Sequence, residues 1–234
     1  MSRDAILGAI RRGLRRGELP DDQAMALRAR LAAHPRHLIP ARSQVPRPAQ
    51  LALFVRNVEK EFGTVARVAE AADVPGAVAD YLASQNLAPD LVMAPHPELR
   101  ALPWADRALL RLREGRAEAS DPVSLQHGYA GVAETGTLVL PGGPQRPTTL
   151  NLLSETEIVV LRASRVFGAY EEIWDLVRAE LAPDGGLLPR NIMLVTGPSR
   201  SADIESVLEL GAHGPRRLHV VLIDDDPAAD PPMS

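Results

Sequence analysis

From residue 50 onward, apolar positions change repeatedly between helical spacing and short continuous runs. Helical stripes are predicted at Leu51–Glu61, Val74–Gln85, Tyr170–Leu181 and Ala202–Leu210, with a helical turn at Thr148–Leu153. Strand-like runs are predicted at Thr64–Ala69, Asp90–Ala94, Val123–Ala133, Thr137–Leu140, Glu157–Leu161, Asn191–Val195 and Leu218–Ile223. This alternation indicates an α/β fold in which a mainly parallel sheet is flanked by helices. Ligands of such sheets bind beyond the carboxyl ends of the strands.

The first fifth of the chain follows a different pattern. Ser2 is placed to cap a helix carrying Ile6, Ile10 and Leu14 at helical spacing, and Asp21–Ala33 predicts a second helix. The four prolines between residues 34 and 48 predict an extended linker. We therefore expect an N-terminal helical arm with a proline-rich linker over residues 1–48, an α/β domain over 49–225 and a disordered tail over 226–234.

Composition limits the chemistry that the chain can perform. It contains no cysteine, so it carries neither a disulfide nor a Cys-ligated iron–sulfur cluster of its own. No apolar run approaches the roughly 18 residues of a membrane span, and no signal-peptide core follows the N-terminus, so we expect a soluble cytoplasmic protein. The first 50 residues hold ten Arg against four acidic residues, yet lack aromatic residues for base stacking. A solvated helix face is favoured there over nucleic-acid binding.

Thr196–Glu205 is the loop richest in turn-forming, hydroxyl and charged residues. Because a predicted strand precedes it and a predicted helix follows, its backbone N–H groups are expected to be free to hold an anion. The residues of such a cradle would be Gly197, Pro198, Ser199, Arg200, Ser201, Asp203 and Glu205. The alternative is a well-capped helix with Asp203 and Glu205 in its first turn. The spacing matches no nucleotide-binding P-loop.

Two further segments carry residues suited to chemistry. In Glu134–Thr137, a carboxylate, two hydroxyls and Gly136 meet at a strand junction, where Glu134 could serve as base or nucleophile. An exposed hairpin turn, with Thr135 and Thr137 as ordinary strand residues, is the alternative. In Gly211–Pro215, His213 lies beside Gly214 and could exchange a proton near neutral pH, although a lone loop histidine is more often structural. The histidine spacings indicate no tight metal site.

Together, three segments resemble the LUD-domain family of lactate-utilisation proteins, most closely its lactate utilisation protein C branch. They are Ala133–Leu140, Thr196–Glu205 and Gly211–Pro215, each in the order and spacing of the family, and the resemblance extends over about residues 50–225. It implies a fold like that of sugar-phosphate isomerases, CoA transferases and 5-formyltetrahydrofolate cyclo-ligase. It also implies one shared pocket. Glu134, Asp203 and His213 are its candidate catalytic residues; Thr135, Gly136, Thr137, Gly197, Pro198, Ser199, Arg200, Ser201, Glu205 and Gly214 are its candidate ligand-binding residues.

The resemblance further implies a place in a system that oxidises L-lactate to pyruvate. This chain would be a subunit without its own cofactor, beside partners that hold iron–sulfur clusters, and would bind a small carboxylate or phosphorylated ligand. Whether it catalyses a reaction is left open. The alternative is a stand-alone enzyme acting on a phosphorylated, CoA-linked or folate-like small molecule, with Glu134 as base or nucleophile.

Overall fold

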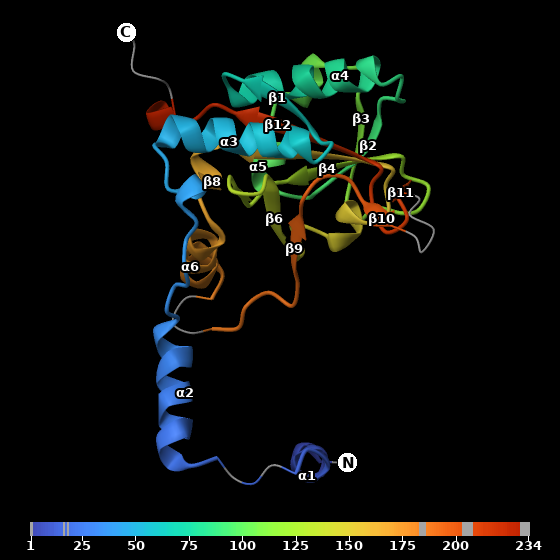
Figure 1. Ribbon diagram of the computed structural model, residues 1–234. Helices are drawn as coiled ribbons and strands as arrows, with labels where there is room; N and C mark the ends of the chain where they lie inside the picture. The colour runs from blue at the N-terminus through green and yellow to red at the C-terminus, as the bar shows by residue number, and fades with distance from the viewer. Residues whose placement is uncertain (1, 16, 18, 183–185, 203–207, 230–234) are drawn as a thin grey trace. The chain divides into compact units, whose positions relative to one another are not determined.

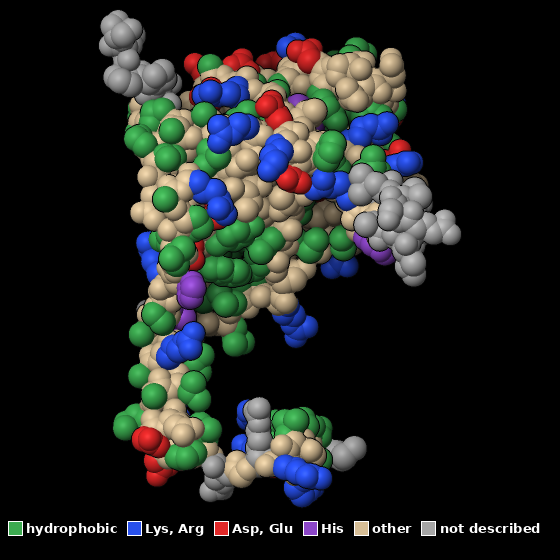
Figure 2. All heavy atoms as spheres, viewed as in Figure 1, with side chains coloured by type: hydrophobic (Ala, Val, Ile, Leu, Met, Phe, Trp, Pro, Cys, Tyr) green, Lys and Arg blue, Asp and Glu red, His purple; other side chains and the backbone are tan. Residues whose placement is uncertain are grey.

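The computed structural model describes residues 2–15, 17, 19–182, 186–202 and 208–229, and the chain divides into two compact units, residues 1–38 and 39–234 (Figure 1). The first unit contains α1 (Arg3–Gly13) and α2 (Asp21–Ala33), and the predicted cap is present, since Ser2 Oγ accepts from the Ala5 N–H. Neither helix buries a residue, and Figure 2 shows apolar side chains exposed along both of them. The first compact unit ends at Leu38.

A six-stranded sheet forms the centre of the larger unit, and all its strand pairs are parallel. In spatial order its strands are β1 (Thr64–Val68), β12 (Arg217–Ile223), β7 (Thr156–Arg162), β4 (Val123–His127), β2 (Asp90–Met93) and β3 (Arg111–Glu114). The predicted α/β architecture with a mainly parallel sheet flanked by helices is therefore confirmed (Figure 1).

Apolar side chains cover both faces of this main sheet, which explains the continuous apolar runs in the sequence. On β7, Ile158 and Val160 pack with α4 (Val74–Ser84), whereas Val159 and Leu161 pack with α3 (Arg47–Lys60). Side chains of a strand alternate between the two faces of a sheet. Glu157 therefore shares the α3 face with Val159 and Leu161.

A second, four-stranded sheet packs on the α3 side of the main sheet. Its order is β8 (Val166–Phe167), β5 (Ala130–Val132), β6 (Thr137–Pro141) and β9 (Ile192–Val195), and α6 (Tyr170–Leu181) packs on it through Ile173 and Val177. Two strand predictions need correction. The run Val123–Ala133 is two strands in different sheets, and β9 pairs antiparallel with β6 instead of joining the parallel sheet.

The helix predicted over Ala202–Leu210 is wrong. Arg200–Ala202 forms β10 and Leu208–Leu210 forms β11, and the two pair as antiparallel strands, while residues 203–207 lie outside the described residues. Backbone hydrogen bonds beside this hairpin favour strands over the predicted helix. Ser199 bonds through its backbone to both Gly211 and Pro215, which holds the two segments together. The loop that was predicted to bind an anion at a helix N-terminus is therefore followed by strand β10 and not by a helix.

Short elements complete the larger unit. They are α5 (Pro97–Arg100) and 3-10 turns at Ala41–Ser43, Ala71–Asp73, Trp104–Asp106, Thr148–Asn151, Ala163–Arg165 and Pro227–Ala229. The start of the predicted tail is held in place, because Asp226 forms an ion pair with Arg47 at 2.5 Å. Among the described residues, no helix combines the length and apolar composition needed to cross a membrane.

Candidate functional site

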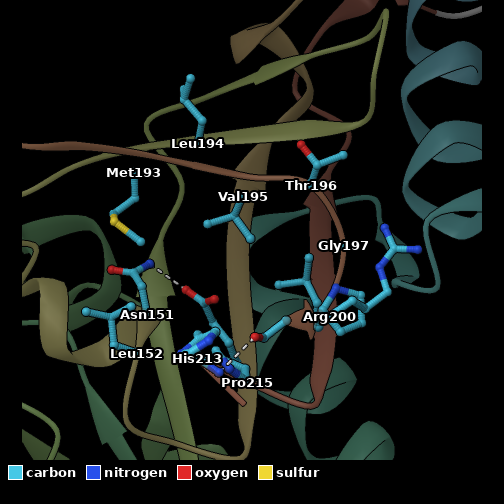
Figure 3. Close-up of a pocket in the computed structure, with 15 residues that line it drawn as sticks. Asn151, Leu152, Met193, Leu194, Val195, Thr196, Gly197, Arg200, His213 and Pro215 are labelled. Atoms are coloured by element: carbon cyan, nitrogen blue, oxygen red, sulfur yellow. Dashed lines mark hydrogen bonds between the residues drawn. The ribbon is translucent and has the colours of Figure 1, made fainter. Parts of the chain in front are cut away.

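Two of the three predicted loops meet at a cavity of about 380 Å³ (Figure 3). Thr196–Arg200 and His213–Pro215 line it together with Asn151 and residues of β9. Ser199 fastens the two loops to each other. Its backbone N–H donates to the Pro215 carbonyl at 2.8 Å, its carbonyl accepts from the Gly211 N–H at 2.9 Å, and its hydroxyl oxygen accepts from the His213 N–H at 3.2 Å.

Gly197 brings the first loop against the end of α3. Its φ is +72°, and a Cβ at this position would overlap the carbonyl oxygen of Glu61. Arg200 reinforces the contact, since its Nη2 lies 2.6 Å from Glu61 Oε2 and its guanidinium stacks over the Phe62 ring. The hydrogen bond from Arg200, together with its charge, lowers the pKa of Glu61. Because Arg200 is already paired, an anion in the cavity would have to share this guanidinium.

The Glu134–Thr137 segment is the β5–β6 turn, and it does not line this cavity. Glu134 is ion-paired with Arg42 at 2.6 Å. Gly136 has φ +67°, and a Cβ there would lie 2.5 Å from the Val58 nitrogen, so this turn also packs closely on α3. Of the three segments predicted to share one pocket, Thr196–Glu205 and Gly211–Pro215 contribute residues to this cavity, whereas the Glu134–Thr137 segment packs on α3.

Hydroxyl groups link this turn to the first loop. Thr137 Oγ1 lies 2.7 Å from both Thr135 Oγ1 and Thr196 Oγ1, and 2.8 Å from the Tyr170 hydroxyl. Asn57 on α3 adds two bonds, donating to the carbonyls of Ala133 and Glu134. Thr135 and Thr137 therefore help to connect the β5–β6 turn to the Thr196–Arg200 loop, and their predicted contact with a ligand stays a prediction.

Some of the remaining predicted site residues line the cavity, and others do not. Pro198, Ser199, Arg200, His213 and Gly214 line the cavity. Ser201 lies on β10, opposite Glu209 of β11. Asp203 and Glu205 lie outside the described residues, so their predicted roles in catalysis and binding stay predictions.

Glu157 is the residue of this cavity that sequence analysis misses. It is fully buried on β7 and lines the cavity. Oε1 accepts from Asn151 Nδ2 at 2.6 Å, while Oε2 has no hydrogen-bond partner. Burial raises the pKa of Glu157 to about 8, so the carboxyl is protonated at neutral pH. In the sequence Glu157 is only a single carboxylate at the start of an apolar run, and this pattern does not identify it as a site residue.

In the main sheet the cavity lies at the amino ends of β7 and β12, not at the carboxyl ends where the fold predicts a ligand, while β9 of the second sheet contributes its carboxyl end and the loop that follows. Glu157 is the second residue of β7, and Pro215 precedes β12. The carboxyl ends of β2 and β4 carry a different polar cluster, formed by His96, Glu98, His127 and Arg146. Ligand atoms of the first three lie within 4.8 Å of one another, a grouping that the histidine spacings did not reveal.

Comparison with known proteins identifies the family. The family model of the LUD domain matches residues 51–223. An uncharacterised protein of Neisseria meningitidis is 38% identical over 96 residues, which are 41% of this chain and 40% of that protein. Lactate utilization protein C of Bacillus subtilis is 35% identical over 94 residues, covering 40% of this chain and 39% of that protein. The matched stretches thus span about two fifths of these relatives.

A solved structure has a similar fold. The crystal structure of a DUF162 family protein from Deinococcus radiodurans aligns with a TM-score of 0.56, covering 76% of this chain and 99% of that one at 21% identity. This likeness supports the fold alone. The resemblance to the sugar-phosphate isomerase and CoA-transferase fold stays a prediction.

Proposed function

Because this chain belongs to the LUD-domain family, we propose that it is a cysteine-free subunit of a lactate-utilisation system. The similarity to lactate utilization protein C of Bacillus subtilis supports the pathway. The absence of cysteine supports the division of labour, since Cys-ligated iron–sulfur clusters for oxidising L-lactate to pyruvate would have to reside in partner subunits.

In this proposal, a small carboxylate or phosphorylated molecule binds in the cavity between Thr196–Arg200 and His213–Pro215. One observation carries it: a fully buried, protonated carboxyl faces this cavity with one oxygen lacking a partner. Buried polar groups are normally hydrogen-bonded, so an unpartnered one calls for an explanation. A ligand oxygen that accepts from the Glu157 O–H supplies it.

Anion binding at this cavity would rely on neutral donors. The Glu157 O–H and the Ser199 hydroxyl would donate to the ligand oxygens, and Arg200 would add charge while keeping its bond to Glu61. His213, which is exposed at the cavity edge, would be positioned to exchange a proton with the ligand. These roles fit a small anion, because each donor can approach a different oxygen.

The pH dependence of binding tests the ligand site. Calorimetric titration with L-lactate, pyruvate and a sugar phosphate between pH 6 and 9 should show affinity falling as pH rises through about 8, where Glu157 ionises and repels the anion. E157Q stays neutral and should show no such fall, and S199A should bind less tightly. S84A, which removes a serine hydroxyl at the exposed end of α4, is the matched control. An identical pH profile in wild type and E157Q would rule the site out.

Native complexes and growth test the pathway. Affinity-tagged chain, purified from its own cells without oxygen, should retain partners with iron–sulfur absorption, and deletion of its gene should slow growth on L-lactate. Normal growth together with no iron–sulfur partner would refute the assignment. Stabilisation by CoA thioesters or folates, but not by L-lactate or pyruvate, would instead favour the stand-alone enzyme.

A further inference from the structure

Arg146 lies at the carboxyl ends of β2 and β4 and is bonded to two histidine rings. Its Nη2 lies 2.9 Å from His127 Nδ1 and 3.1 Å from His96 Nε2, and its Nε lies 3.2 Å from His127 Nδ1. No described carboxylate forms an ion pair with it. The carboxylates nearby are already engaged, Glu98 with Arg162 at 2.7 Å and Glu180 with Arg165 at 2.8 Å.

Donors outnumber acceptors in this cluster. Burial and the Arg146 charge lower the pKa of His96 to about 4 and that of His127 to about 3, so both rings are neutral at pH 7. A neutral imidazole offers one lone pair. His96 nevertheless faces two N–H groups, that of Arg146 at Nε2 and the backbone N–H of Glu98 at Nδ1, 3.3 Å away. One of these donors therefore has no acceptor on the ring and is available to a ligand oxygen.

A metal ion fits this cluster poorly, although His96, Glu98 and His127 are common ligand types. The two imidazole rings are stacked, with centroids 3.6 Å apart and planes inclined by 19°. A histidine binds a metal in the plane of its ring, at roughly 2 Å. Lone pairs of nearly parallel rings run side by side and do not converge on one ion at that distance. The Arg146 guanidinium would also repel a cation.

We propose that Arg146 and His127 form a binding site for a small carboxylate anion at the carboxyl end of the main sheet. The carboxylate takes the two-pronged guanidinium edge that now contacts the rings. His127 Nδ1 is then freed and can accept a hydrogen bond from a hydroxyl group on the ligand, while its Nε2–H stays directed at Glu98 Oε1, 3.4 Å away. One guanidinium with no ion pair to a described carboxylate matches one negative charge, which favours a carboxylate over a phosphate dianion.

This site also agrees with the general rule for parallel sheets, and it shares no residue with the proposed cavity at the amino ends of β7 and β12. Polar side chains border the cluster, since those of Glu98 and Arg162, which pair with each other, are 46% and 38% exposed. His127 itself is only 11% exposed, so a bound anion would be largely shielded from water and its bond to Arg146 strengthened.

Ring signals of the histidines provide a direct test. In nitrogen-15 NMR of the full chain, L-lactate should shift the His127 and His96 ring resonances in a saturable way, with assignments taken from H127Q. R146Q should abolish the shift, and R146K should weaken binding at least about tenfold, because a lysine lacks the planar fork. R111Q, a matched loss of an exposed guanidinium at the amino end of β3, should bind as wild type does.

Other outcomes would overturn the assignment. They are the absence of any ring shift with L-lactate, equal shifts in wild type and R146K, saturation by inorganic phosphate but not by carboxylates, or stoichiometric Zn²⁺ binding that displaces Arg146. The E157Q and S199A variants separate this site from the cavity, since they should leave the His127 shift intact. Loss of the shift in S199A with retention in R146Q would assign the ligand to the cavity instead.

Discussion

Asn151 donates a side-chain N–H to Glu157 across 2.6 Å, and this bond ties the cavity to the interior of the sheet. The same amide accepts from Gln126 Nε2 at 3.2 Å, and Gln126 Oε1 in turn accepts from the His127 N–H at 3.1 Å. A continuous line of buried polar side chains therefore runs from Glu157 to the backbone of His127. The two candidate sites are physically connected through Asn151 and Gln126.

The raised pKa of Glu157 predicts that stability falls with rising pH. The carboxyl keeps its proton up to about pH 8 in the native state but loses it near pH 4.5 when unfolded. Between these values the native state binds more protons, so the free energy of unfolding decreases by about 1.4 kcal/mol per pH unit from this group. Above pH 8 the carboxyl is ionised in both the native and the unfolded state, so the stability that its native-state proton provided has been lost.

Urea denaturation between pH 5 and 9 checks this, with E157Q as the comparison. Glutamine is neutral and can still accept from Asn151, so E157Q should lack this component of the slope and be more stable than wild type at pH 9. Parallel stability curves for the two proteins would show that Glu157 titrates normally.

Replacing Gly197 with alanine should destabilise the protein by about 2 kcal/mol or more. The substitution adds a Cβ where φ is +72° and where the Glu61 carbonyl already fills the space. G143A is the matched control, because a Cβ at Gly143 would meet nothing within 4 Å and its φ is not positive. Chemical denaturation measures both, and a G197A variant as stable as G143A would contradict the close packing on α3.

Sequence periodicity correctly predicted most of the helices and strands of the fold. It failed where the secondary structure of a segment depends on pairing with a distant strand. Tyr170–Leu181 is a helix with the predicted bounds, and its apolar spacing defines the face that buries Ile173 and Val177. Asp21–Ala33 also has the predicted bounds, although that helix buries no residue. Ala202–Leu210 has equally helical spacing, yet Leu208–Leu210 pairs with β10, which no local pattern reveals. Non-local hydrogen bonds outweigh local preference in such short segments.

The candidate sites divide in the same way. Ser199 and His213 come together because short loops follow β9 and precede β12, a proximity that the family motifs could indicate. Glu157 was hidden, since a carboxyl in an apolar run reveals nothing about the partner that its burial requires. The stacking of His96 on His127 was also out of reach, because it depends on the order of β2 and β4 in the sheet.

Substituting Glu134 should have little effect on ligand binding at the cavity. Glu134 pairs with Arg42, whose side chain is 66% exposed, and it does not line the cavity. The Glu134 side chain is only 9% exposed, but a glutamine oxygen can still accept from Arg42 at the solvent-exposed end of the pair. E134Q should therefore change the free energy of unfolding by no more than about 1 kcal/mol. Affinity for L-lactate should stay within about twofold of wild type, whereas S199A loses affinity. Loss of binding in E134Q with unchanged stability would restore the predicted three-loop pocket.

Acid should destabilise the protein through its buried histidines. The pKa of His219 is lowered to about 4 by burial, and His96 and His127 are lowered to about 4 and about 3. These rings take up protons near pH 6.5 only when the chain unfolds. Their contribution to the free energy of unfolding is therefore complete above pH 6.5 and is lost as pH falls toward 4. H219F keeps a ring stacked on Tyr81 and removes an Nε2 that has no partner. Its stability should therefore fall less steeply below pH 6.5, by about 1.4 kcal/mol per pH unit. Urea denaturation of both proteins from pH 4 to 7 measures the difference, and equal slopes would mean that His219 is protonated in the native state.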